Sequence, residues 1–321
     1  MRPSRPAQPR YMRAVTGRVA AVAVAIAAAI ATAGCGLGAG RGTSDVAVVV
    51  TRDFGSRAVA RRTEHRVPGA ETVLALLERS FSVSTRYGGG FVESIDGNSG
   101  TASRRDWFYY VNGIQAAKGA AGTAVHRGDR IWWDLHDWRV ADSIPAVVGS
   151  FPEPFVHGAA GKRLPTALEC APDTPAACRI VAAELGRIGI PVASQLLGTG
   201  SGTESLSLEV GTWRDMRGQI VTSLIDNGPG TSGVYARFTA TGQALELLDP
   251  RGGTVRTLRA GAGLVAASAQ GSFEPTWVIT GTDAAGVSAA AEALTPARLA
   301  EHFALAVQGA SSYPVPLEPA R

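Results

Sequence analysis

The sequence predicts an α+β protein with two folded domains, and three observations support this fold class. The 321 residues suit about two domains of ordinary size, and 45% of them are hydrophobic, enough for each domain to bury a core. Short segments of alternating hydrophobicity, typical of strands, recur along most of the chain. Segments with the spacing of amphipathic helices interrupt them. We therefore expect a first domain with a sheet around one helix, followed by a second α+β domain with an antiparallel sheet.

The first 34 residues have the composition of a lipoprotein signal peptide. Arginines precede an uncharged, alanine-rich run at 19–33, which is shorter than the about 20 residues of a membrane span. The Thr-Ala-Gly sequence before Cys35 resembles the bacterial lipobox, although its first position is usually leucine. We therefore expect a lipid on Cys35 and a location at the extracytoplasmic face of the cell membrane. An ordinary cleaved signal peptide is the alternative.

The positive charge of the chain is concentrated in this leader. Five arginines precede Cys35 with no acidic residue among them: Arg2, Arg5, Arg10, Arg13 and Arg18. Removing these five charges from the net charge of +4 leaves −1 for the mature chain. No basic stripe interleaved with aromatics follows, so nucleic acid is not an expected partner. Because the region before the apolar run is long, we expect the start at Met12 rather than Met1.

Differences in composition along the mature chain predict a tether, two domains, a linker and a tail. Residues 35–44 are glycine-rich and nearly uncharged, which predicts a flexible tether. The first domain is expected at 45–140 and the second at 167–312. A proline- and glycine-rich linker at 141–166 separates them, and its two phenylalanines indicate that it packs on a domain. Residues 313–321 are expected to form a tail.

The first domain begins with strands and one helix. Strands are predicted at 45–54 and 57–66, where β-branched residues alternate with polar ones. A Val-Pro-Gly turn then leads into a helix with one apolar stripe, made of Ala70, Val73, Leu74, Leu77 and Phe81. A strand near 91–95 follows.

Two further strands complete this domain. Asn112-Gly113, between β-rich residues, is a strong signal for a two-residue hairpin. The last strand is predicted within RGDRIWWDLHDW, residues 127–138. Two strands, a helix and then several strands is the order of a β-grasp fold.

Residues 45–140 resemble the β-grasp family related to the carboxy-terminal domain of the cobalamin carriers transcobalamin and intrinsic factor. The resemblance rests on VPGAETVLALLERSF and on RRDWFYYVNGIQAAKGAAGTAVHRGDRIWWDLHDW. It implies the fold and makes cobalamin one candidate ligand, because this domain closes over cobalamin in the animal carriers. Those carriers hold the ligand in a larger helical domain, and nothing in this chain resembles it. No cofactor is otherwise expected.

The second domain is predicted to mix helices and strands. One helix carries Ile180, Val181, Leu185 and Ile188 on a single stripe after a cysteine pair, and another is expected at 213–225. Strands are expected at 189–197, 204–210, 233–240, 244–249, 253–260, 263–269 and 276–281. Two alanine-rich helices near 284–308 end the domain, which resembles no named family.

Cys170 and Cys178 are predicted to form a disulfide. They are an even pair in an exported chain, separated by a short loop that holds Pro172 and Pro175. A metal site would need two more ligands at short spacing, and none is nearby. The chain-entropy model gives such a bond about 2–3 kcal/mol of stabilisation.

The last strand of the first domain carries the candidate ligand site. Alternation places Ile131, Trp133 and Leu135 on one face, which we expect to be core. The opposite face has two indoles around an ionisable pair, a composition suited to stacking a flat or sugar-like ligand: Trp132, Asp134, His136 and Trp138. Tyr110 on the partner strand is added to the site, although the pairing register stays open. In the alternative, residues 141–157 cover the two indoles, and Asp134 and His136 are solvated.

These features predict a membrane-anchored extracytoplasmic lipoprotein that binds a small ligand, a corrinoid or a glycan, through its β-grasp domain. The alternative is a cell-envelope adaptor whose aromatic face docks a partner protein or a cell-wall polymer. An enzyme is not predicted, because the histidines are scattered and no serine elbow, metalloprotease helix or catalytic cysteine appears. No metal site is predicted, because Asp134 and His136 lack a third ligand.

Overall fold

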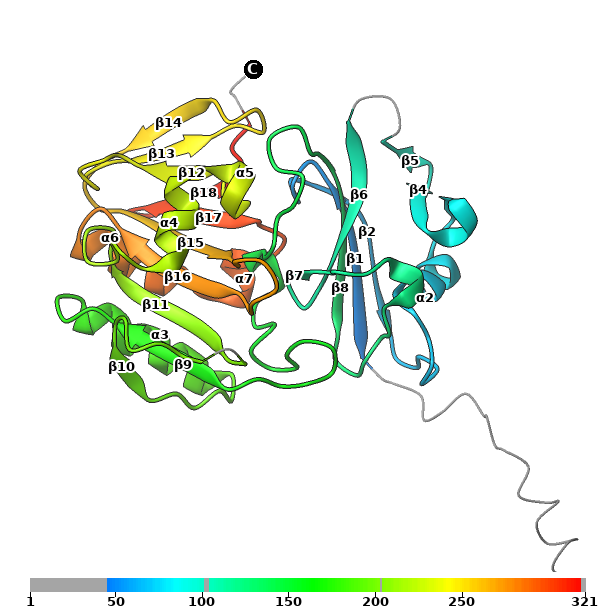
Figure 1. The fold of residues 1–321 in the computed structure, drawn as a ribbon, viewed down its shortest axis with the longest axis horizontal. Helices are drawn as coiled ribbons and strands as arrows, with labels where there is room; N and C mark the ends of the chain where they lie inside the picture. The colour runs from blue at the N-terminus through cyan, green and yellow to red at the C-terminus, as the bar shows by residue number, and fades with distance from the viewer. Residues whose placement is uncertain (1–44, 101–103, 203, 319–321) are drawn as a thin grey trace, which may run out of the picture. The chain divides into compact units, whose positions relative to one another are not determined.

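The computed structural model describes residues 45–100, 104–202 and 204–318. The expected signal peptide, the tether and Cys35 lie outside these residues. No helix within the described ranges is long and apolar enough to cross a membrane. The fold class is α+β, as the sequence predicts, with several sheets and short helices (Figure 1).

The amino-terminal part is a five-stranded sheet packed against one helix (Figure 1). Its strands, in spatial order, are β2 (Arg57–Glu64), β1 (Val46–Arg52), β8 (Arg130–Asp137), β6 (Arg105–Val111) and β7 (Ile114–Gln115). The first and last long strands, β1 and β8, lie side by side and parallel, and the other pairs are antiparallel. Helix α2 (Val73–Ser80) buries its apolar stripe on one face of this sheet. This is the arrangement expected of a β-grasp sheet.

Local sequence signals explain several of these elements. Thr72 caps α2, because its side chain accepts a hydrogen bond from the Ala75 backbone N–H at 3.2 Å. Asn112 and Gly113 both have positive φ, 55° and 79°, which a two-residue turn between antiparallel strands requires. A small sheet that the sequence only partly predicted follows α2 and consists of β3 (Val83–Arg86), β4 (Phe91–Ile95) and β5 (Asn98–Ser99).

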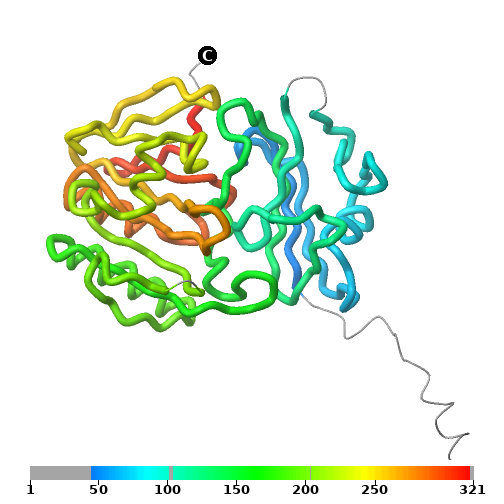
Figure 2. Tube along the Cα trace, in the orientation of Figure 1, coloured from blue at the N-terminus to red at the C-terminus, as the bar shows by residue number. Residues whose placement is uncertain are grey.

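Residues 141–165, green in Figure 2, run between the two larger sheets. The Gln115 N–H donates to the Pro145 carbonyl at 3.0 Å, and the Val147 N–H donates to the Gly113 carbonyl at 2.9 Å. The next residue, Val148, donates to the Phe303 carbonyl at 3.1 Å. The segment expected to be a linker is therefore hydrogen-bonded to both parts.

The carboxy-terminal part is built on a seven-stranded sheet. Its strands, in spatial order, are β10 (Ser194–Leu196), β9 (Thr166–Cys170), β11 (Leu206–Thr212), β16 (Thr276–Gly281), β15 (Ala262–Ser268), β17 (Ala304–Gln308) and β18 (Ser311–Val315). The first four are mutually parallel, and the pairs from β16 onward are antiparallel. The sheet is mixed, whereas the sequence predicted an antiparallel sheet.

Different elements cover the two faces of the seven-stranded sheet. One face packs against α3 (Pro175–Arg187), α6 (Ala284–Ala293) and α7 (Pro296–Leu299). The other face packs against α4 (Ile220–Asp226), α5 (Pro229–Ser232) and the small sheet of β12 (Ala236–Phe238), β13 (Leu245–Leu248) and β14 (Thr254–Leu258). Cys170 ends β9 and is joined by a disulfide to Cys178, with a Cα–Cα distance of 6.0 Å. The predicted pairing is present, although α3 begins before Cys178 rather than after it.

Three expectations for this part differ from the structure. The helix expected at 213–225 begins only at Ile220, because Thr212 and Asp215 hydrogen-bond to each other in a turn that precedes it. The last residues of the expected helices at 284–308 form β17, a strand buried on both faces, whose short apolar run has no diagnostic period. Strand β18 also crosses the boundary expected between 312 and 313.

The described residues from Asp45 onward form one compact unit with three hydrophobic clusters. The first lies between α2 and the five-stranded sheet, and the second lies between the seven-stranded sheet and its covering helices α3 and α6. The third, here called the shared core, includes Trp132 and Tyr110 from the first part and Tyr235 and Phe303 from the second. The two predicted domains therefore share a core.

Candidate functional site

The pairing of β6 with β8 decides which aromatic residues lie beside Trp132. Tyr110 is directly opposite Trp132, and Phe108 is opposite Asp134. Directly opposite residues share a face of a sheet, so Tyr110 lies on the predicted face, with its ring centroid 5.8 Å from that of Trp132. Burial, followed by the charge of Asp134, raises the pKa of Tyr110 well above its ordinary value.

This aromatic face lies inside the shared core rather than at the surface. Trp132, Asp134, His136 and Tyr110 are each at most 1% exposed. The ring of Phe303 lies 5.2 Å from that of Trp132 and 5.4 Å from that of His136. Alternation correctly separated Trp132 from the core residue Trp133, but the chain also covers the face that was expected to be open. The cover comes from Phe303, just before β17, and from the segment 141–149, whose Ala141, Ile144 and Val147 belong to the same cluster and whose Gly149 lies against the Trp132 ring. The alternative that residues 141–157 cover Trp132 is therefore correct in part, but Asp134 and His136 are buried rather than solvated.

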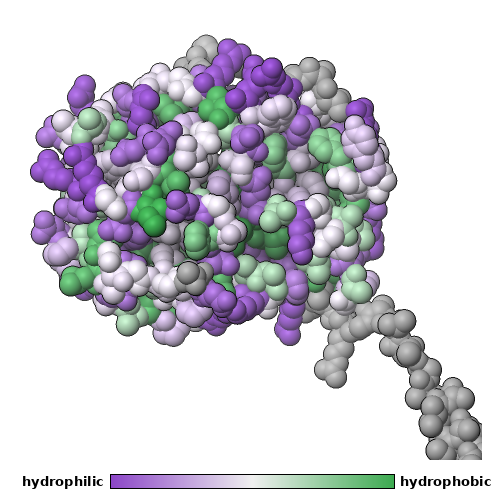
Figure 3. Space-filling view, in the orientation of Figure 1, coloured by the Kyte–Doolittle hydropathy of each residue, from purple (hydrophilic) through white to green (hydrophobic). Residues whose placement is uncertain are grey.

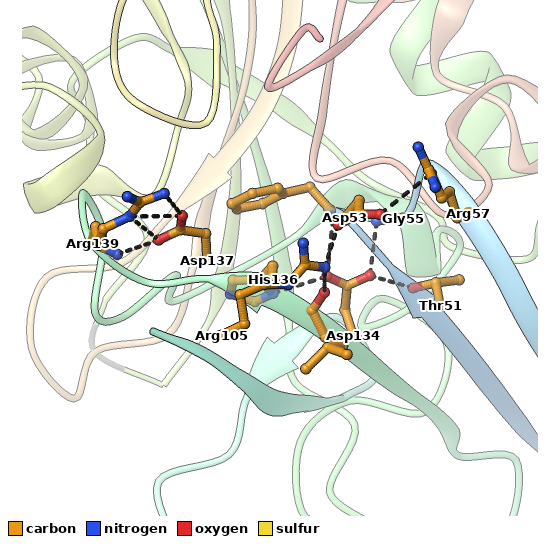
Figure 4. Close-up of polar contacts among 11 residues, drawn as sticks. Thr51, Asp53, Gly55, Arg57, Arg105, Asp134, His136, Asp137 and Arg139 are labelled. Carbon is orange, nitrogen blue, oxygen red and sulfur yellow. Dashed lines mark hydrogen bonds and ion pairs between the residues drawn. The ribbon is translucent and has the colours of Figure 1, made fainter. Parts of the chain in front are cut away.

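Asp134 acts as a structural acceptor in this core (Figure 4). Its carboxylate accepts hydrogen bonds from Thr51 Oγ1 at 2.5 Å and from the Phe54 and Gly55 backbone N–H groups at 3.0 and 2.8 Å. His136 Nδ1 lies 2.9 Å from the same carboxylate. The carboxylate therefore fixes the turn after β1, and no oxygen is left free for a ligand.

The imidazole of His136 is equally enclosed. It stacks between the rings of Phe54 and Phe108, at centroid distances of 4.7 and 4.4 Å. Trp138 lies beyond the end of β8 and is half-buried, and its backbone N–H donates to the Arg104 carbonyl at 3.1 Å. The five residues of the predicted site are thus brought close in the fold, with four of them buried among protein side chains.

A charged groove of about 390 Å³ lies beside this core. Arg105 pairs with Asp53, and Arg139 pairs with Asp137 (Figure 4). Burial opposes ionisation of Asp137, but the hydrogen bonds from Arg139 outweigh it and lower the pKa of Asp137. Because these charges neutralise one another, the groove gives little indication of a charged ligand.

A second cavity, of about 350 Å³, lies on the polar face of the seven-stranded sheet. The sheet contributes its floor, made of Glu169, Ser207, Glu209, Ser268 and Thr276. The first turns of α4 form one wall, and the backbone at 198–202 forms another. We call this space the Glu169–Glu209 cavity.

Strand geometry explains why two carboxyl groups meet in this cavity. In the parallel pairing of β9 with β11, Glu169 is the partner of Glu209. Their preceding neighbours, Leu168 and Leu208, point to the opposite face and pack beneath α3 and α6. The two glutamates therefore lie side by side on the same face.

The two carboxyl groups have different environments. Glu169 Oε2 accepts hydrogen bonds from the backbone N–H groups of Gly198 and Gly200, at 2.8 and 3.4 Å. Glu209 is 8% exposed, and its Oε2 has no hydrogen-bond partner among the described residues. Burial, followed by repulsion from Glu169, raises the pKa of Glu209 to about 7. A buried carboxyl oxygen without a partner is costly and needs an explanation.

The mouth of the cavity is partly apolar. Ile220 at the start of α4 is 62% exposed, and Phe273 is 57% exposed. Within the cavity, Ser207 Oγ donates to Ser201 Oγ at 2.5 Å. No group of three or more His, Cys, Asp or Glu side chains in the described ranges could hold a metal ion.

Neither Glu169 nor Glu209 was predicted from the sequence as a site residue. The available signal was the alternation in ESLSLEV, where Leu206, Leu208 and Val210 share one face and Ser207 and Glu209 share the other. Such alternation ordinarily indicates a solvent-facing side of a sheet, so it did not suggest a site.

Comparison with known families concerns only the amino-terminal part. Residues 70–137 match a family described as Domain of unknown function (DUF4430). The chain contains a DUF4430 domain. The match runs from just before α2 to the end of β8, and therefore does not include the Glu169–Glu209 cavity. No curated protein matches the chain.

Proposed function

We propose that the chain is a lipid-anchored extracytoplasmic protein that binds a small ligand in the Glu169–Glu209 cavity. The observation that carries this proposal is the buried Oε2 of Glu209, which lines a cavity and has no partner among the described residues. The cavity volume of about 350 Å³ falls at the lower end of the roughly 300–1,000 Å³ typical of small-molecule sites.

Two features support the extracytoplasmic location. The leader has the charge and hydropathy pattern of an export signal, and Cys35 follows a lipobox-like sequence. The other two cysteines are joined in a disulfide, which persists in oxidising compartments. A lipid on Cys35 would hold the ligand-binding part close to the membrane.

We further propose that the DUF4430 domain is a transcobalamin-like β-grasp domain with a supporting role. Its strand order and single helix agree with that fold. Its aromatic face packs in the shared core, so this domain would position the cavity-bearing part rather than hold the ligand itself. A corrinoid is much larger than the cavity, so the size of the cavity favours a smaller ligand.

The adaptor alternative has less support, because the aromatic face on which it depends is buried. On the face seen in Figure 3, hydrophobic and hydrophilic side chains are interspersed without one continuous hydrophobic patch. A docking surface for a protein partner ordinarily shows such a patch.

Native mass spectrometry of the processed full-length lipoprotein tests the proposal. The protein, released from detergent after incubation with a small-molecule extract of its own cells, should retain an adduct of small mass. Ser207→Phe fills the cavity floor and should abolish the adduct, whereas Ser84→Phe, at an exposed position on β3, should retain it. An adduct that persists in Ser207→Phe would place the ligand elsewhere, and the absence of any adduct on the wild type would overturn the proposal.

A further inference from the structure

The Glu169–Glu209 cavity combines two neighbouring carboxyl groups with a hydrocarbon mouth. Its acidic floor is closed by the sheet, and its opening is bordered by Ile220, Leu224 and Phe273. A ligand that fits both regions carries a hydrogen-bond donor at one end and an apolar body at the other. This arrangement excludes anions, because they would meet the carboxyl groups at the floor.

The donor is best supplied by a cation. Glu209 Oε2 is buried and has no partner, so a donor from the ligand would satisfy it. A positive donor would also relieve the repulsion between Glu209 and Glu169, which a neutral hydroxyl cannot do. Hydrogen bonds between charged partners are roughly twice as strong as neutral ones.

The coordination chemistry favours an ammonium group over a metal ion. Calcium takes about 6–8 oxygen ligands, and magnesium requires near-octahedral geometry. In the described part of the chain, no cluster of three acidic, histidine or cysteine side chains is placed to bind a metal. An ammonium group has only three donors, which two carboxyl groups and a nearby hydroxyl could accept. Ser207 supplies such a hydroxyl on the cavity floor.

We infer that the ligand is a small primary amine with a short hydrocarbon body, bound with its ammonium group between Glu169 and Glu209. The inference rests on the proposed function and specifies the chemical class of the ligand. The hydrocarbon body lies against α4 and Phe273, where an apolar surface is exposed.

Few titratable groups face this position. The carboxyl group of Glu169 faces it from β9, and that of Glu274 faces it from the segment before β16. Burial raises the pKa of Glu274, whereas nearby Lys162 opposes this rise and Glu204 adds to it. The lining residues of α4, including Ile220, are uncharged. Of these carboxyl groups, Glu209 is the one whose pKa is raised to about 7, so its protonation state should control amine binding most directly. Binding of the ammonium group removes the proton from Glu209.

Isothermal titration calorimetry of the processed protein tests the inference with named probes. Butylamine, putrescine and 2-phenylethylamine are compared with butan-1-ol and calcium chloride at pH 8 and pH 6. At least one amine should bind, and its apparent affinity should fall roughly tenfold between these pH values as Glu209 becomes protonated. Glu209→Gln should weaken that amine at least tenfold at pH 8. Glu184→Gln makes the same chemical change on α3, across the sheet, and should bind like the wild type.

The outcomes separate this inference from the proposed function. If butan-1-ol binds as well as the amines, or if calcium displaces them, the ligand class is wrong while the cavity remains a binding site. If no amine binds at millimolar concentration but a cellular adduct is retained, only the amine inference fails. Thermal melts first establish that each variant is folded, and if Glu209→Gln is not, the pH dependence of the wild type decides alone.

Discussion

Replacing Glu209 by glutamine should stabilise the ligand-free protein in a pH-dependent way. Its pKa rises from the ordinary 4.5 to about 7 on folding. The folded state therefore binds more protons than the unfolded state between these values, so stability falls as pH rises from about 4.5 to about 7. With about 1.4 kcal/mol for each pKa unit, the cost above pH 7 approaches roughly 3 kcal/mol. Glutamine has nearly the same shape and cannot ionise, so it avoids this cost.

Urea unfolding of dialysed protein at pH 4, 6 and 8 measures the effect. Glu209→Gln should change the free energy of unfolding little at pH 4 and raise it by up to about 3 kcal/mol at pH 8. Glu184→Gln serves as the control, because Glu184 pairs with Arg187 near the surface of α3. Equal effects of Glu209→Gln at pH 4 and pH 8, or a loss of stability at pH 8, would refute the reasoning. A retained cation would mask the cost, so the protein is checked for adducts first.

Three further predictions concern the shared core, the anchor and the disulfide. Trp132→Ala and Trp133→Ala should each reduce the free energy of unfolding, measured by urea denaturation, by about 3–5 kcal/mol, because both indoles are buried. Near-wild-type stability of Trp132→Ala would show that its face is not part of a core. Cys35→Ala should release the protein from membranes or leave it unprocessed, and unchanged membrane fractionation with no acyl group on the wild type would contradict lipidation. Cys170 and Cys178 should resist alkylation in the native protein until a reductant is added, so ready labelling without reductant would exclude the bond in solution.

Much of the amino-terminal fold could be predicted because its signals are local. Alternation over β1 and β8 identified both strands, and the apolar stripe identified α2. Asn112-Gly113 has the positive φ angles that its turn requires, so a dipeptide was enough to locate the hairpin. The separation of the Trp132 and Trp133 faces also followed from alternation alone.

Only part of the cover over the Trp132 face could be predicted, because the segment 141–157 was the expected alternative and the contribution of Phe303 was not foreseen. Phe303, the residue before β17, packs on Trp132, and both Phe303 and β17 lie in a stretch that the alanine-rich sequence indicated as helix. Alternation identifies which residues share a face, but it carries no information on which distant segment packs against that face. An aromatic face with an ionisable pair therefore predicted a ligand site. In the structure, the Asp134 carboxylate already accepts hydrogen bonds from Thr51 and from the backbone N–H groups of Phe54 and Gly55.

The Glu169–Glu209 cavity illustrates the converse problem. Glu209 alternates with Leu208 as a solvent-facing residue would, yet β9 and β16 flank its strand and α4 forms a wall of the space above it. The parallel register that sets Glu169 beside Glu209 depends on long-range pairing, which a single sequence does not reveal. A carboxyl group in this position is costly to ionise unless a donor satisfies it, and the described residues supply none to its Oε2. Ionised Glu209 therefore destabilises the ligand-free protein, and a bound cation would remove that cost. For this reason, Glu209→Gln should raise the stability of the ligand-free protein and weaken ligand binding.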